Sequence, residues 1–255
     1  MGPLGYADHA VAAFDALAAA RRETDLDPRL RLQVSLPSPA SVVAAFVAHE
    51  ARAEVEDAYQ RALVDELTVL TDRIPPDQLA VQWDCCAEIL MNPQTPPIVA
   101  PWRREHLSPV GDLSAQIPAE VEVGLHLCHG NYRGRRQADL ATIAPMVEVA
   151  NVLSRLVSAH RPLDFLHLPV RPDTAPVPYL APLADLKVAP TCDIYLGVIS
   201  DPDDTSGAWR RLSAGQRVLT GRELGVAAEC GLGRREPDGL PALLRQHRTL
   251  STAPS

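Results

Sequence analysis

The sequence has no long apolar run and no basic stripe. None of its 255 residues belongs to an apolar segment near the roughly 20 residues that span a bilayer. The N-terminus also lacks the basic segment and hydrophobic core of a secretory signal. The net charge is −8 and the arginines are scattered among acids, so no surface is predicted to neutralise a phosphate backbone. We therefore expect a cytoplasmic protein with no membrane and no nucleic-acid partner.

Cysteines are few, and their spacing provides no disulfide framework. Five cysteines are an odd number in a chain of this length, which is typical of free thiols in a reducing compartment. The thiols are therefore available for metal binding or catalysis.

The composition is that of a globular protein. Hydrophobic residues make up 46% and charged residues 22% of the chain, close to the average for soluble domains. A chain of this length is typical of one large α/β domain. We expect a single domain over residues 1–255, with 248–255 as a flexible tail.

Short segments rich in branched apolar residues alternate with segments of helical periodicity, which predicts a largely parallel sheet covered by helices. The predicted strands are 30–36, 79–83, 121–128, 163–168, 193–199 and 225–230. The predicted helices are 6–22, 41–71 (broken in two), 138–159, 208–220 and 240–247. The proline-rich segments 74–76, 93–101 and 172–182 are expected to be surface loops.

A histidine and a cysteine lie two residues apart in the predicted strand 121–128. Side chains at i and i+2 of a strand point to one face, so His126 and Cys128 should converge. Cys230 ends the last predicted strand, where active-site residues of barrels gather. Catalytic zinc takes three nitrogen or sulfur ligands from the protein and leaves a fourth position open. Taken alone, the pattern also fits a core histidine and small buried cysteines.

Three motifs extend this pattern. The segments HLCHGN, VQWDCCAEI and AECGLGRR resemble the H-x-C-Y, IQ-D-E-P and D-C-G-L motifs of the cobalamin-independent methionine synthases, in the same order and over about residues 2–247. The resemblance implies a (β/α)8 TIM-type barrel with Zn²⁺ held by His126, Cys128 and Cys230. It also implies methyl transfer from 5-methyltetrahydrofolate or another donor to homocysteine or a related thiol.

One metal ligand of that family has no direct counterpart here. The family's glutamate lies on the intervening strand, whereas segment 163–168 offers His167, and Glu148 falls in a predicted helix. The fourth ligand is therefore open among His167, Glu148 and water or substrate. Asp84 matches the aspartate that contacts the substrate amino group in the family, with a helix N-cap as the alternative. We expect Asp84 and His167 to be catalytic residues.

Two further cysteines, Cys85 and Cys86, follow Asp84. Adjacent strand residues point to opposite faces, so both thiols cannot easily reach one ion. We interpret both as packing residues.

The predicted strands are two short of a closed barrel. The resemblance implies that the family's first two strands are the ones lacking. Unpaired strand edges are usually covered or paired, so we expect a homo-oligomer or a partner chain to complete the barrel.

Three functions remain open at this point. The first is zinc-dependent methyl transfer to a thiol. The second is a non-catalytic or partner-dependent barrel subunit in a specialised pathway. The third is a decarboxylase of the related uroporphyrinogen decarboxylase type, because a shared barrel does not decide the chemistry.

Overall fold

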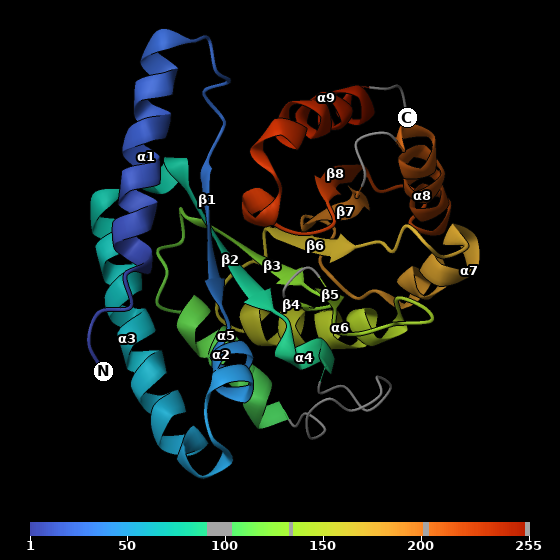
Figure 1. Cartoon of the computed structure of the whole chain (residues 1–255). Helices are drawn as coiled ribbons and strands as arrows, with labels where there is room; N and C mark the ends of the chain where they lie inside the picture. The colour runs from blue at the N-terminus through green and yellow to red at the C-terminus, as the bar shows by residue number, and fades with distance from the viewer. Residues whose placement is uncertain (91–103, 133–134, 201–203, 253–255) are drawn as a thin grey trace.

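A sheet of six parallel strands forms the centre of the molecule. The computed structural model describes the chain except for residues 91–103, 133–134, 201–203 and 253–255. The strand order is β1-β2-β3-β6-β7-β8, and Figure 1 shows the strands side by side. Their bounds are Leu32–Pro37, Leu79–Cys85, Glu122–Leu127, Phe165–Pro169, Asp193–Ile199 and Leu224–Ala228. A separate two-stranded antiparallel pair is formed by β4 (Asn131–Tyr132) and β5 (Arg135–Arg136).

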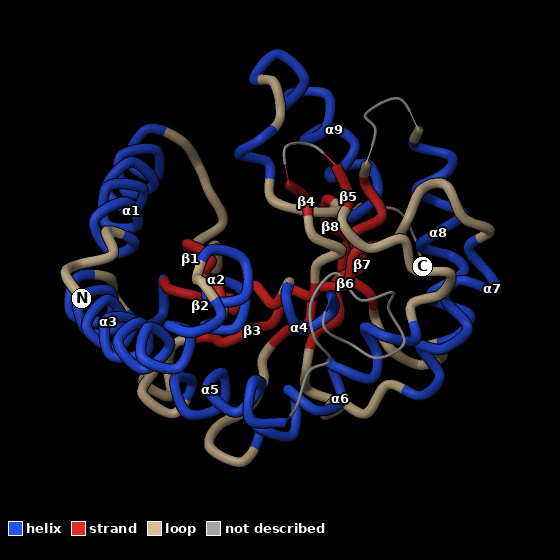
Figure 2. Tube along the Cα trace, turned by 60° about the horizontal axis from the view of Figure 1, so that its bottom comes forward, coloured by secondary structure: helices blue, strands red, loops and turns tan. Residues whose placement is uncertain are grey.

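The longer helices lie around the outside of this sheet, and Figure 2 shows α1, α3, α5, α6 and α8 following one another around the strands, whereas the short helices α2 and α4 lie nearer the middle of this view. Their bounds are α1 Tyr6–Glu23, α2 Pro39–Phe46, α3 Arg52–Arg73, α4 Ala87–Leu90, α5 Arg104–Ser114, α6 Ala144–Ser158, α7 Pro176–Leu180, α8 Thr205–Val218 and α9 Leu240–Ser251. None of the described helices combines the length and the apolar character of a membrane-spanning segment.

The predicted α/β class is confirmed, and all six predicted strands are present. The helix expected over 41–71 is indeed broken, into α2 and α3. Two predictions were wrong in part: the helix expected over 138–159 begins only at Ala144, and the segment 172–182 is not only a loop, because it contains α7. The helix begins with Pro176, and a proline in the first turn removes no helical hydrogen bond. The predicted proline-rich loop 93–101 lies outside the described residues.

Each strand presents one face to the helices and the other to the interior of the curved sheet. In β3, the side chains of Val123, Leu125 and Leu127 are fully buried in the core. At alternate positions of the same strand, Glu122 and His126 line a pocket on the opposite face. This alternation places the apolar residues under the helices and the polar residues together in the interior.

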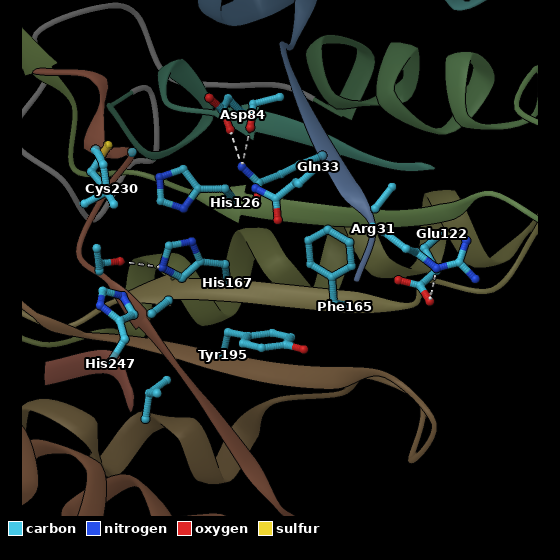
Figure 3. A pocket seen from close by; sticks show the side chains of 18 of the residues that line it. Arg31, Gln33, Asp84, Glu122, His126, Phe165, His167, Tyr195, Cys230 and His247 are labelled. Carbon is cyan, nitrogen blue, oxygen red and sulfur yellow. Dashed lines mark hydrogen bonds and ion pairs between the residues drawn. The ribbon is translucent and has the colours of Figure 1, made fainter. Parts of the chain in front are cut away.

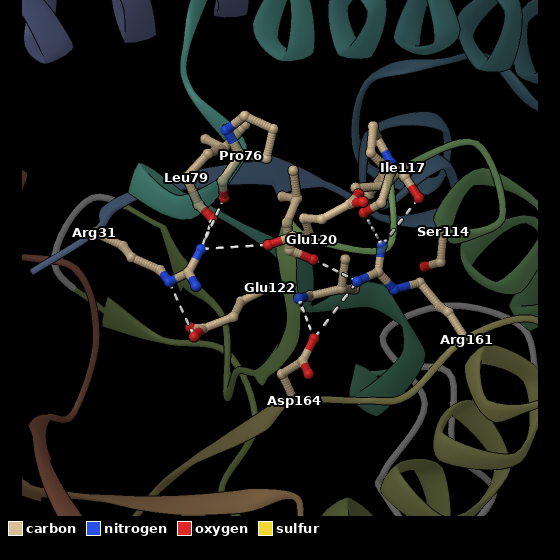
Figure 4. Close-up of polar contacts among 12 residues, drawn as sticks. Arg31, Pro76, Leu79, Ser114, Ile117, Glu120, Glu122, Arg161 and Asp164 are labelled. Carbon is tan, nitrogen blue, oxygen red and sulfur yellow. Dashed lines mark hydrogen bonds and ion pairs between the residues drawn. The ribbon is translucent and has the colours of Figure 1, made fainter. Parts of the chain in front are cut away.

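Two arginines join the amino ends of the strands (Figure 4). The Arg31 guanidinium donates to the carbonyl oxygens of Pro76 and Leu79 and forms an ion pair with Glu122. Arg161 donates to the carbonyl oxygens of Ile117, Pro118 and Val121, and lies 3.6 Å from a carboxylate oxygen of Asp164. A planar guanidinium with several N–H donors can hold the amino ends of several strands at a fixed spacing.

The two outer strands pair on one side only. Among the described residues, β1 pairs with β2 and β8 pairs with β7, and no strand pairs with their other edges. The six strands are thus a curved parallel sheet of the kind that lines a barrel.

Candidate metal centre

The ends of two strands, β3 and β8, bring a histidine and two cysteines together. His126 lies in β3, Cys128 follows that strand directly, and Cys230 lies two residues after the end of β8. One ring nitrogen of His126 and the sulfurs of Cys128 and Cys230 all lie within 4.8 Å of one another. The three ligand atoms expected from the sequence therefore meet at one point, at the carboxyl end of the sheet.

His126 provides the clearest sign that the cluster suits a metal ion. Its side chain is only 3% exposed, and both ring nitrogens are buried without a hydrogen-bond partner in the described structure. A buried polar group left without a partner costs about 1 to 3 kcal/mol, and a bound ion would remove that cost. One imidazole and two thiols form a donor set that suits zinc.

The two thiols are protonated at neutral pH when no metal is bound. The pKa of Cys230 rises to about 12, because hydrogen bonding with Cys128 and burial outweigh the opposite effect of His126. The pKa of Cys128 also rises to about 12: its hydrogen bond with Cys230 lowers it, but the contact with Cys86 and burial outweigh that effect. Metal binding here must therefore displace protons.

His167 lies beside the cluster but is not a member of it. Its ring centroid is 4.4 Å from that of His126, and its Nε2 lies 3.0 Å from the carbonyl oxygen of Ala228. Since a carbonyl can only accept, Nε2 carries the proton. Burial lowers the pKa of His167 well below 6.5, and nearby His126 lowers it further. Glu148, the other candidate fourth ligand, lies on α6 and is also outside the cluster.

A pocket of about 610 Å³ opens beside the cluster on the interior face of the sheet. His126 and Cys230 line it, and so do Asp84 and His167 (Figure 3). Asp84 lies in β2 opposite His126, is half-buried, and accepts a hydrogen bond of 2.8 Å from Gln82. The pocket thus joins two of the three candidate metal ligands to both predicted catalytic residues.

The sequence analysis did not identify two aromatic residues, Phe165 and Tyr195, that line this pocket. The rings of Phe165 and Tyr195 meet edge to face with centroids 6.2 Å apart. Phe165 lies across Gly124, where an added Cβ would come within 2.1 Å of the ring, and Tyr195 lies across Gly225 in the same way, at 2.3 Å. The glycines on neighbouring strands were the signal that could have indicated flat-lying rings.

The adjacent residues Cys85 and Cys86 differ in burial and in their neighbours. Cys85 is fully buried, as predicted for a packing residue. Cys86 is only half-buried, and besides packing against Gly130 its thiol lies next to that of Cys128. Where β2 ends, the chain turns into α4, and this turn directs Cys86 toward the end of β3. Ser41 Oγ fixes the turn by accepting from the backbone N–H groups of Cys86 and Ala87.

No family model and no curated protein matches this chain. Solved structures of other proteins do match it. A B12-independent methionine synthase from a Shewanella species, in complex with selenomethionine, superposes with a TM-score of 0.61 at 12% identity, over 98% of this chain and 67% of that one. A putative vitamin-B12-independent methionine synthase from Listeria monocytogenes superposes with a TM-score of 0.54 at 17% identity, over 88% of this chain and 65% of that one.

This chain therefore spans about two thirds of the length of either structure. At these identities the likeness concerns the fold. Over most of its length, the chain folds like the B12-independent methionine synthases, as the motifs indicated.

Proposed function

We propose that this protein is a zinc-dependent enzyme that transfers a methyl or other alkyl group to a thiol. The observation that carries the proposal is the meeting of His126, Cys128 and Cys230, with the nitrogens of buried His126 lacking any other partner in the described structure. The likeness to B12-independent methionine synthases supports it. By this analogy, the acceptor is homocysteine or a related thiol, and the donor is 5-methyltetrahydrofolate or another methylated compound.

His126, Cys128 and Cys230 would hold the zinc. When bound, zinc supplies a positive charge that lowers the pKa of a thiol ligand and so makes thiolate available at neutral pH. The pocket reaches His126 and Cys230, so an acceptor thiol in the pocket could approach a zinc ion held by these residues. The fully buried core behind the strands keeps water away from the other side.

Asp84 and His167 would orient the reactants. Asp84 offers a carboxylate on the same pocket wall as His126 and suits the ammonium group of an amino-acid thiol. His167 donates to the carbonyl of Ala228, two residues before Cys230. We assign His167 a positioning role: it holds the segment that carries the third metal ligand.

The outer edges of β1 and β8 pair with no other strand in the described structure. They favour a second function of the same site, in which the protein depends on a partner. We propose that the six strands correspond to the last six of a (β/α)8 barrel, and that a second copy or a partner chain covers the two edges. In this reading the chain holds the metal, and the covering chain completes the pocket. Such a protein would act in the cytoplasm.

The test is metal content by elemental analysis of the purified chain and two variants. Cys128→Ser should lose most of the bound zinc, because a neutral hydroxyl is a far poorer ligand than a thiolate. Cys192→Ser is the matched control, since Cys192 is a buried free thiol that lies outside the cluster. Equal zinc content in both variants would contradict the proposal. Methyl transfer to homocysteine by the zinc-loaded chain then tests the acceptor.

A further inference from the structure

Cys86 is a half-buried thiol that the proposed function does not use. β2 and β3 pair in parallel with Asp84 opposite His126 and Cys85 opposite Leu127. The pairing continues one step further, because the backbone N–H of the residue after β3 donates to the carbonyl of Cys85 at 3.2 Å. The next residue of each strand end is a cysteine, so Cys86 lies opposite Cys128.

This placement meets the distance requirement of a disulfide. Neighbouring strands lie about 4.8 Å apart, within the range of about 4.4 to 6.8 Å that a disulfide needs between Cα atoms. The Cys86 sulfur points toward the segment after β3: a Cβ added to Gly130 would lie 3.2 Å from it. Gly130 has a φ of +71°, and its missing side chain leaves the space that the thiol occupies.

Cys86 is not a member of the metal cluster, although it adjoins one of its ligands. The three ligand atoms that meet within 4.8 Å come from His126, Cys128 and Cys230. Cys128 is therefore shared: it faces the metal position on one side and the Cys86 thiol on the other. Both Cys86 and Cys128 are partly exposed, so a small oxidant can reach them.

We propose that Cys86 and Cys128 form a reversible disulfide under peroxide, and that this bond and zinc at the cluster exclude each other. In the reaction, hydrogen peroxide oxidises one thiol to a sulfenic acid and releases a water. The second thiol attacks that sulfur, the S–S bond forms, and a second water leaves with the remaining proton. The two sulfurs are oxidised and the peroxide is reduced to two waters. A sulfur in a disulfide is no longer a thiolate ligand, so the cluster loses one of its three donors.

The disulfide itself follows from the placement of the two cysteines, whereas the exclusion of zinc rests on the proposed function. The experiment treats the full chain with hydrogen peroxide, once zinc-free and once zinc-loaded, and counts thiols after denaturation. In the zinc-free chain the count should fall from five by two, and proteolysis should yield one fragment pair joined through Cys86 and Cys128. A dithiol reductant should restore both thiols and the uptake of zinc. The zinc-loaded chain should keep its thiols several-fold longer.

Two variants separate disulfide formation from zinc binding. Cys86→Ser should bind zinc as the unchanged chain does but form no linked pair, and Cys192→Ser should form it as before. A pair joined through Cys128 and Cys230 would overturn the proposal. So would zinc loss in Cys86→Ser equal to that in Cys128→Ser, because Cys86 would then be a ligand. If the Cys86–Cys128 pair forms in a chain that never binds zinc, the disulfide stands and the proposed function fails.

Discussion

Two buried glutamates of this protein should respond to the same substitution with opposite signs. Glu88 lies on α4 and is fully buried. Ser41 donates to its Oε2 at 3.1 Å, but its Oε1 has no hydrogen-bond partner in the described structure. Glu66 lies on α3 and accepts from the backbone N–H groups of Leu4, Gly5 and Ala7 at 2.6 to 2.9 Å, so it holds the start of α1.

Burial raises the pKa of Glu88 from 4.5 to about 7, although hydrogen bonds from Ser38 and Ser41 act against it. The folded chain therefore holds this proton more tightly than the unfolded chain does. The resulting stability is complete below pH 4.5 and is lost as the pH rises through 7. At about 1.4 kcal/mol for each pH unit between these values, ionised Glu88 costs the folded state about 3 kcal/mol.

Glu88→Gln, which imitates the protonated side chain, should therefore raise the free energy of unfolding by about 2 to 3 kcal/mol at about pH 8 and by less than about 1 kcal/mol at about pH 5. Glu66→Gln is the matched control. It weakens charge-assisted bonds to backbone donors and should destabilise the protein by about 2 kcal/mol at both pH values. Urea denaturation followed by circular dichroism measures both. An equal effect of Glu88→Gln at the two pH values would mean that Glu88 is already ionised in the folded protein.

Three further predictions concern the metal, the pocket and the assembly. Zinc must displace the protons of Cys128 and Cys230, so the apparent zinc affinity, measured against a chromogenic chelator, should fall about a hundredfold from about pH 8 to about pH 7; an affinity independent of pH would refute the two-thiolate site. Gly124→Ala should destabilise the fold by about 1 to 3 kcal/mol in thermal unfolding, because its Cβ would meet the Phe165 ring. Gly239→Ala, with no atom within 4 Å, should not. The free edges of β1 and β8 should make the isolated chain self-associate or require a partner; a stable monomer in sedimentation, with full methyl transfer to homocysteine, would rule this out.

The strands could be predicted from the sequence because their signals are local. The segment 193–199 coincides with β7, and the other five predicted strands differ from the observed ones by at most two residues at either end. The helix predicted over 240–247 continues to Ser251, so part of the predicted tail 248–255 is helical. The single-domain assignment stays a prediction.

Some helices could not be recognised because their sequences carry opposing signals. Arg104–Ser114 forms α5 although Pro109 lies inside it and many of its residues are polar. The packing of α5 against α6 and α3 outweighs the weak local preference, which is a tertiary effect.

The metal ligands could be predicted from their positions along the predicted strands, whereas the residues that contact them could not. Alternation along β3 was enough to bring His126 and Cys128 to one end of the strand. The interaction between Cys128 and Cys86 depends on the turn that leads from β2 into α4, and the bond from His167 to the carbonyl of Ala228 depends on the bulge between β7 and β8. Neither irregularity has a local sequence signal.

The arginines at the amino ends of the strands fix the spacing of those ends independently of the candidate metal centre. Arg31 and Arg161 gather carbonyl groups from the segments that lead into β2 and β3, so these strand entrances keep their spacing whether or not the barrel is closed. At the opposite end, Arg171 donates to the carbonyl oxygen of Leu140 and Arg211 to that of Val198. In the described structure neither guanidinium forms a hydrogen bond with the three candidate metal ligands. If a second chain covers β1 or β8, as proposed above, we expect its effect on strand spacing to appear at the carboxyl end, as a change in the distances among His126, Cys128 and Cys230 and so in metal affinity.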